Sequence, residues 1–164
     1  MKAERGNTDR FRRDELSSRG DAYESAEKPD GPTRCPVCNA SFTGGRWSWK
    51  VAPEDAHVVM CPACQRIHDK FPAGYVMIKG QFFAEHRDEI VRLVDNYEQR
   101  EKAEHPLQRI MAMEDVSGGL QVSTTHTHLA RGIAQALQEA YKGDMKLRFS
   151  RDENLVRAVW KRDR

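Results

Sequence analysis

The chain has 164 residues, of which 38% are hydrophobic and 32% charged, so it can form one domain or two small ones around a modest core. Its net charge of +2 is too small to indicate nucleic-acid binding by itself. No stretch approaches the ~18 consecutive apolar residues of a membrane span, and the first residues contain no apolar signal-peptide segment. We therefore expect a cytoplasmic protein, without membrane contact, whose cysteine thiols stay reduced.

Residues 1–33 are rich in charge, Ser, Gly and Pro, and they contain almost no aliphatic side chain beyond Leu16. Such a segment cannot bury enough apolar surface to offset its ordering entropy. We predict a disordered charged tail over residues 1–33, and a mixed-charge tail of this kind is most often simply solvated.

Four cysteines follow in two CxxC pairs, Cys35 with Cys38 and Cys61 with Cys64, with 22 residues between the pairs. Paired CxxC turns at this separation are typical of tetrahedral zinc sites, since each turn presents two thiolates. The sequence therefore predicts a Zn²⁺ ribbon over residues 34–72. Four thiolates fill the coordination shell and leave no position for a reactive water, so the predicted site is structural and the protein is not an enzyme.

Other chemistries use similar cysteine patterns. Two disulfides suit an exported protein, and a redox CxxC does not need a second copy at this spacing. A rubredoxin-type iron centre remains an alternative to zinc. His68, shortly after the second pair, could also replace one cysteine ligand.

Two tryptophans lie between the cysteine pairs, in the run RWSWK. Strand alternation would place Trp47 and Trp49 on one face, with Arg46, Ser48 and Lys50 on the other. Aromatic rings beside cations suit single-stranded nucleic acid. The alternative is that both rings cover the small core of the ribbon.

Residues 73–164 are predicted to form a small two-layer α+β unit with a mostly antiparallel sheet. A strand-like run, GYVMIKGQFF, precedes a helix over about 84–102, which the His105-Pro106 step ends. Two strands then meet around Gly118-Gly119. A second helix over about 126–142 follows, capped by one of three threonines and ended by Gly143, before two final strands. The candidate caps are Thr124, Thr125 and Thr127.

The last two strands alternate apolar and basic residues. If the apolar residues face the core, Arg148 lies opposite Arg157 on the outer face, and like charges opposed across strands destabilise a sheet. An anionic partner would relieve that repulsion, and residues 142–164 contain eight Lys or Arg against four acidic residues. An ordinary solvated face is the alternative. The predicted nucleic-acid-binding residues are Arg131, Lys142, Lys146, Arg148, Arg157, Lys161, Trp47 and Trp49.

Several runs together resemble a family of small bacterial zinc-ribbon proteins of unsettled function, over residues 34–162. The runs are CPVC, CPAC, PAGYVMIKGQF, HRDEIVRLV, AEHPLQRI, VSTTHTHLARGIAQAL and LVRAVWKR. More distantly, the chain resembles the N-terminal region of the large-ribosomal-subunit export adaptor and its archaeal relatives. In that adaptor a zinc module precedes an α/β segment and the protein acts on ribosomal particles. The adaptor has more cysteines and further domains, so the resemblance implies ribosomal RNA binding but not export, and it implies no catalytic residue.

These observations predict a zinc-stabilised, non-catalytic protein that binds RNA or associates with the ribosome. The alternative is a protein–protein adaptor built on a structural zinc ribbon.

Overall fold

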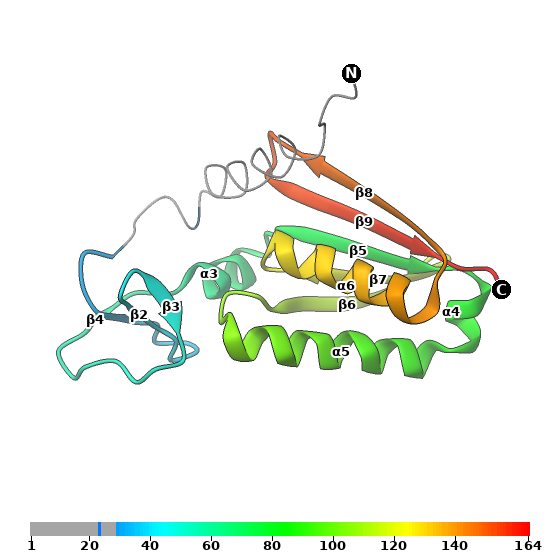
Figure 1. Cartoon of the computed structure of the whole chain (residues 1–164). Helices are drawn as coiled ribbons and strands as arrows, with labels where there is room; N and C mark the ends of the chain where they lie inside the picture. The colour runs from blue at the N-terminus through cyan, green and yellow to red at the C-terminus, as the bar shows by residue number, and fades with distance from the viewer. Residues whose placement is uncertain (1–22, 24–28) are drawn as a thin grey trace, which may run out of the picture.

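The computed structural model of the chain describes Tyr23 and residues 29–164, and it has an α+β architecture with two separate sheets (Figure 1). The disordered tail predicted for residues 1–33 lies mostly outside this range. Its last residues are described, and the first strand begins at Thr33, whose side chain is fully buried. Within the described part of the chain, no helix combines the length and the apolar character needed to cross a membrane.

The first sheet is small and has the strand order β3-β2-β1-β4. Strands β1 and β2 are antiparallel, as are β2 and β3, whereas β1 and β4 are parallel. The helix α3 follows β4. We call residues 33–69 the cysteine unit. Its elements are β1 (Thr33–Arg34), β2 (Ser41–Thr43), β3 (Arg46–Ser48), β4 (His57–Val58) and α3 (Pro62–Asp69).

The second sheet has five strands in the order β6-β7-β5-β9-β8. The two hairpins, β6 with β7 and β8 with β9, agree with the four strands predicted from alternation and turn residues. The strands are β5 (Gly74–Lys79), β6 (Ile110–Val116), β7 (Gly119–Thr124), β8 (Asp144–Ser150) and β9 (Leu155–Lys161).

The prediction of a mostly antiparallel sheet is corrected: the sheet is mixed, because its inner strands β5 and β9 run parallel. Apolar alternation specifies which face of a strand is buried, but it carries no information about the direction of the neighbouring strand. Here α6 leads to the edge strand β8, and the hairpin back from β8 places β9 alongside β5 in the same direction.

The helix predicted over about 84–102 corresponds to α5 (Arg87–Glu104), and a short helix, α4 (Gln81–Glu85), precedes it where the sequence predicts that the strand-like run GYVMIKGQFF continues. Helix α4 ends at His86, and α5 begins directly after it. The ring of His86 stacks on Phe82 with centroids 4.0 Å apart, and its Nδ1 lies 3.0 Å from the carbonyl oxygen of Phe82. This local contact accompanies the break, which hydrophobic periodicity did not indicate.

Helix α6 (Thr127–Tyr141) is close to the predicted second helix, but its cap differs. The N-cap is His126, whose Nδ1 accepts a hydrogen bond of 3.1 Å from the backbone N–H of His128. The threonine hydroxyls donate elsewhere: Thr124 to the carbonyl of His126 and Thr125 to that of Leu107.

The main core lies between the second sheet and the helices, which pack on one of its faces (Figure 1). Helix α6 contributes a fully buried stripe of Leu129, Ile133 and Leu137, as its helical spacing predicts. Trp160 of β9 is also fully buried, and its Nε1 donates to the carbonyl of Lys142 at 2.7 Å. The alternate residues of the same strands point to the opposite sheet face, on which neither α5 nor α6 packs.

Candidate metal centre

The first cysteine pair lies on a tight turn directly after β1. The N–H of Cys35 donates to the carbonyl of Ala40 at 2.8 Å, and the N–H of Asn39 donates to the carbonyl of Cys35 at 3.0 Å. Asn39 adopts a positive φ of 66°, which asparagine tolerates better than most residues. The turn also points the N–H of Ala40 at the sulfur of Cys38, at 3.5 Å.

The second pair lies at the start of α3. Cys61 is the N-cap, and its sulfur accepts a hydrogen bond of 3.4 Å from the N–H of Cys64 in the first turn. Pro62 occupies the first helical position, where its missing N–H costs nothing. The helix therefore fixes the spacing between these two sulfurs.

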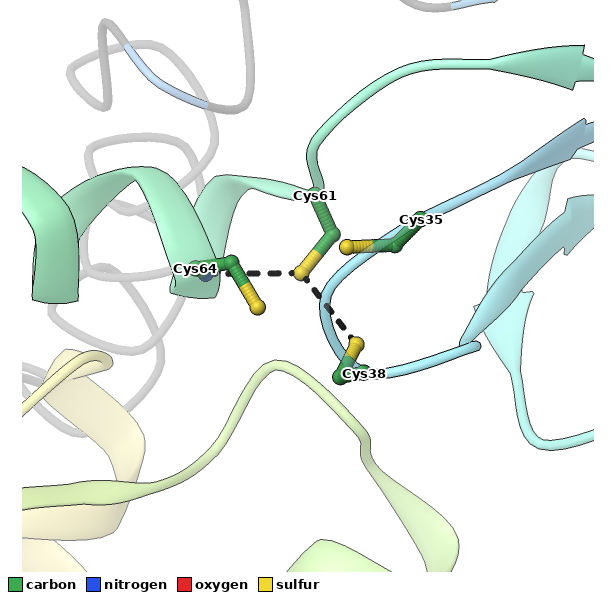
Figure 2. Close-up of side chains that lie close together, drawn as sticks. All are labelled: Cys35, Cys38, Cys61 and Cys64. Carbon is green, nitrogen blue, oxygen red and sulfur yellow. Dashed lines mark hydrogen bonds between the residues drawn. The ribbon is translucent and has the colours of Figure 1, made fainter.

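The four sulfurs converge on one point between the two turns, as Figure 2 shows. All four Sγ atoms lie within 4.8 Å of one another, and those of Cys38 and Cys61 are 3.8 Å apart. Tetrahedral zinc with Zn–S distances of about 2.3 Å requires sulfurs separated by about 3.8 Å. None of the four cysteines forms a disulfide, and three of them are buried. The cluster thus fits a metal ion held by four thiolates.

A buried arginine from outside the cysteine unit completes the site. The guanidinium of Arg109 donates to the sulfurs of Cys38 at 3.0 Å, Cys64 at 3.2 Å and Cys61 at 3.5 Å. Four thiolates exceed the charge of a divalent ion by two, so a cation at this position offsets part of the excess. Arg109 would therefore stabilise a metal-loaded cluster by charge and by hydrogen bonding.

The backbone around Arg109 holds its side chain in place. Its Nε donates to the carbonyl of Pro106 at 2.7 Å, and its own N–H donates to the hydroxyl of Thr125 at 2.9 Å. The guanidinium carbon also lies 5.7 Å from the ring centroid of Trp49. These contacts orient the guanidinium toward the cysteines and connect the cysteine unit to the second sheet.

Comparisons of the chain with protein-family models, with curated proteins and with solved structures find no match.

In the metal-free cluster, burial favours the protonated form of two of the four cysteines by raising their pKa values. Burial raises the pKa of the Cys61 thiol, and the nearby Cys38 raises it further. Burial also raises the pKa of Cys64, against the hydrogen bond from Arg109, which lowers it. Burial of Cys35 acts in the same direction, but backbone N–H groups of Cys61, Cys38 and Val37 outweigh it and bring the pKa of Cys35 to about 7. A metal ion would therefore displace protons from the buried thiols.

Arg109 stays cationic in this environment. Burial by itself lowers the pKa of the guanidinium, but the contacts with Cys64, Cys61 and Cys38 raise it above its ordinary value. No sequence pattern indicated Arg109, because it precedes a strand and meets cysteines that lie 45 to 71 residues earlier in the chain. Only the docking of the two parts of the fold reveals this contact.

The structure places three residues near the cysteines for which the sequence left alternatives open: His68, Trp47 and Trp49. His68 is well exposed, its Nδ1 lies 3.1 Å from a carboxylate oxygen of Asp69, and it is not part of the sulfur cluster. Trp47 packs beside the cysteines and meets the ring of Phe42 edge-on at 5.6 Å. Trp49 lies beyond the end of β3, and its Nε1 donates to the carbonyl of Lys102 in α5 at 2.7 Å. Trp47 is thus half-buried beside the cysteines, whereas Trp49 remains 38% exposed and contacts α5 through its ring nitrogen.

A groove opens beside the cluster, where the cysteine unit meets the α5–β6 connection. It has a volume of about 590 Å³, and its walls include Phe42, Trp47, Met60 and Leu107. A more polar hollow of about 550 Å³ shares His105, Gln108 and His126 with it. Arg131 lines this polar hollow.

The predicted basic residues divide between two places. Arg148 pairs directly with Arg157 across the β8–β9 ladder, as the alternation predicted. Lys146 lies two residues before Arg148, and Lys161 lies four residues after Arg157. Both lysines therefore point to the same sheet face as the two arginines. Arg131 lies on α6, which packs on the opposite face of the sheet, and Lys142 forms the C-cap of that helix. Neither Arg131 nor Lys142 is on the strand face shared by the other four.

Proposed function

We propose that the protein is a non-catalytic RNA-binding protein, stabilised by a structural Zn²⁺ in an N-terminal ribbon and associated in the cytoplasm with ribosomal or other RNA. One observation carries the RNA part: Lys146, Arg148, Arg157 and Lys161 share one sheet face. Four neighbouring cations on one surface match the regular negative charge of a phosphate backbone.

The donor set supports zinc in a structural role. Four convergent sulfurs suit soft thiolate coordination, and a closed tetrahedral shell leaves no position for a substrate or a reactive water. Arg109 reinforces this interpretation, because it donates to three of the sulfurs and lies only 7% exposed. The metal centre would then contribute stability, and partner binding would fall to another surface.

Two of the four basic residues on this sheet face form ion pairs with neighbouring carboxylates, and these ion pairs are weak. Arg157 lies 3.9 Å from Glu153, and Lys161 lies 3.7 Å from Asp163, with about half of each side chain exposed. Exposed ion pairs of this kind contribute at most about 1 kcal/mol. Phosphates can therefore replace these carboxylates at little cost, and they would also screen the opposition of Arg148 and Arg157.

The test is a salt titration of RNA binding with a charge-matched control. Arg148→Gln with Arg157→Gln should weaken binding of an RNA oligonucleotide or of ribosomal particles, and should flatten the slope of log affinity against log salt by roughly 0.7–0.9 for each phosphate that is no longer neutralised. Arg92→Gln with Arg100→Gln removes the same charge from the exposed surface of α5 and should leave the slope unchanged. Equal binding by both double variants at every salt concentration would refute the proposal.

A protein–protein adaptor is the second candidate, and exposed apolar side chains on the cysteine unit favour it. Val51 is 96% exposed, Val37 63% and Val58 56%. Apolar residues gathered on one small unit are a common feature of protein interfaces. A tagged pull-down from native lysate separates the candidates, because RNase treatment should release the partners of an RNA-binding protein but not those of an adaptor.

A further inference from the structure

Within the described residues, neither α5 nor α6 packs on one face of the second sheet, and that face carries an aromatic ring as well as cations. Tyr75 of β5 pairs with Ser123 of β7 on one side and with Arg157 of β9 on the other. Arg157 in turn pairs with Arg148 of β8. Residues that pair directly across strands point to the same face, so Ser123, Tyr75, Arg157 and Arg148 form one row across the sheet.

Two further rows follow along the strands. Met77 of β5 pairs with Val159 of β9, and Val159 pairs with Lys146 of β8. In the last row Lys79 of β5 pairs with Lys161 of β9, and Lys161 pairs with Asp144 at the start of β8. The central strand therefore presents Tyr75, Met77 and Lys79, and cations border it on the β8–β9 side. Lys79 and Tyr75 were not among the residues predicted from the sequence.

The ring of Tyr75 is partly accessible, unlike that of a core residue. Its side chain is half-buried, and its row neighbour Ser123 is small. The guanidinium carbon of Arg157 lies 5.3 Å from its ring centroid, so a cation already sits against the ring. A flat aromatic surface beside an arginine is the combination on which unpaired bases stack while their phosphates meet cations.

The charges indicate where a bound strand would lie. The rows over β5, β9 and β8 hold five basic residues and one acidic residue, Asp144, whereas the same face of β6 carries Glu114, which pairs with Gln121 of β7. A polyanion would therefore follow the β5–β9–β8 half of the face and avoid the β6 edge.

We propose that this face binds single-stranded RNA, with Tyr75 stacking on a base and Lys79, Lys146, Arg148, Arg157 and Lys161 contacting phosphates. The inference rests on the proposed RNA binding and makes it specific for strand type. In a duplex the bases are stacked inside the helix and cannot reach the ring, so duplex RNA can use only the cations.

The experiment compares a single-stranded RNA decamer with a duplex of the same sequence, by fluorescence anisotropy at several salt concentrations. The single strand should bind at least about tenfold more tightly at moderate salt. Tyr75→Leu should weaken single-strand binding by about fivefold or more, as expected when one base no longer stacks, and should leave duplex binding unchanged. Tyr75→Phe keeps the ring and should bind like the parent.

A second measurement uses the unaltered protein, so that it does not depend on the stability of a variant. Photo-crosslinking with 5-bromouridine RNA, mapped by mass spectrometry, should label the peptide that contains Tyr75. Crosslinks confined to Trp47 or Trp49 would overturn the inference, as would equal binding of single strand and duplex with no effect of Tyr75→Leu. In these cases RNA binding itself would stand. If the protein binds neither RNA at low salt, or an acidic peptide competes as well as RNA does, both proposals fail.

Discussion

The guanidinium of Arg109 donates a hydrogen bond of 3.0 Å to the sulfur of Cys38, across 71 residues of chain. Arg109 precedes β6 of the second sheet, and Cys38 belongs to the cysteine unit. The contact makes the sulfur cluster a junction between two parts of the fold. Metal retention and the docking of these parts should therefore depend on each other.

Replacing Arg109 should loosen the metal. Arg109→Gln leaves the excess thiolate charge without its buried cation, so we expect the free energy of unfolding to fall by about 3–5 kcal/mol. Arg109→Lys keeps the charge but loses the forked hydrogen bonds, and should lie between the parent and the glutamine variant. Chemical denaturation measures the free energy of unfolding, and the rate at which a chelator extracts the bound metal measures how firmly the cluster holds it. Arg46→Gln, an exposed change of equal charge in the same unit, is the control, and equal extraction rates in Arg109→Gln and Arg46→Gln would contradict the role assigned to Arg109.

Removing the metal should unfold the cysteine unit. Structural zinc contributes roughly 10–16 kcal/mol of apparent binding energy in small zinc modules, far more than so small a core can supply. Elemental analysis of reduced protein should find one zinc per chain, and Cys61→Ser should lose it together with the native fluorescence of the nearby tryptophans. His68→Ala is the control, because His68 lies outside the sulfur cluster. Iron in place of zinc would correct the metal, and no metal at all would refute the site.

The opposed arginines should cost the free protein a little stability. Arg148→Gln removes the repulsion across the β8–β9 ladder, and the free energy of unfolding should rise by a few tenths of a kcal/mol. Arg157→Gln also gives up the contacts of Arg157 with Tyr75 and Glu153, so its effect should be nearer zero. Chemical denaturation at low and high salt measures both effects, and salt should shrink the difference between Arg148→Gln and the parent. A clear loss of stability in Arg148→Gln would show that its side chain has a structural role.

The packing of α5 on α6 depends on Gly132. A Cβ at this position would lie 2.6 Å from Cζ of Tyr97 and even closer to its hydroxyl. Gly132→Ala should therefore lower the free energy of unfolding by about 1–3 kcal/mol, since overpacking outweighs the better helix propensity of alanine. Combining it with Tyr97→Leu removes the clash, so the double variant should lose less stability than the two single changes added together. Simple additivity in thermal or chemical denaturation would exclude this contact as the cause.

The local features of the fold could be predicted from sequence because their causes are local. Two CxxC pairs brought four sulfurs together, since each turn fixes two of them. The helical spacing of Leu129, Ile133 and Leu137 identified the buried stripe of α6. Period-two alternation in β8 and β9 placed Arg148 opposite Arg157, because a hairpin with known buried faces has few possible registers.

Other features depended on contacts between distant segments, and only the tertiary structure decided them. The parallel pairing of β5 with β9 follows from how the α6 crossover and the last hairpin fit on the sheet. The contact of Trp49 with Lys102 and that of Arg109 with the cysteines exist only once the cysteine unit docks on the second sheet. Tyr75 resembles any strand tyrosine until its neighbours across the sheet are known. A sequence encodes the period and the chemistry of each segment, whereas the partner of a side chain depends on which segments fold against one another.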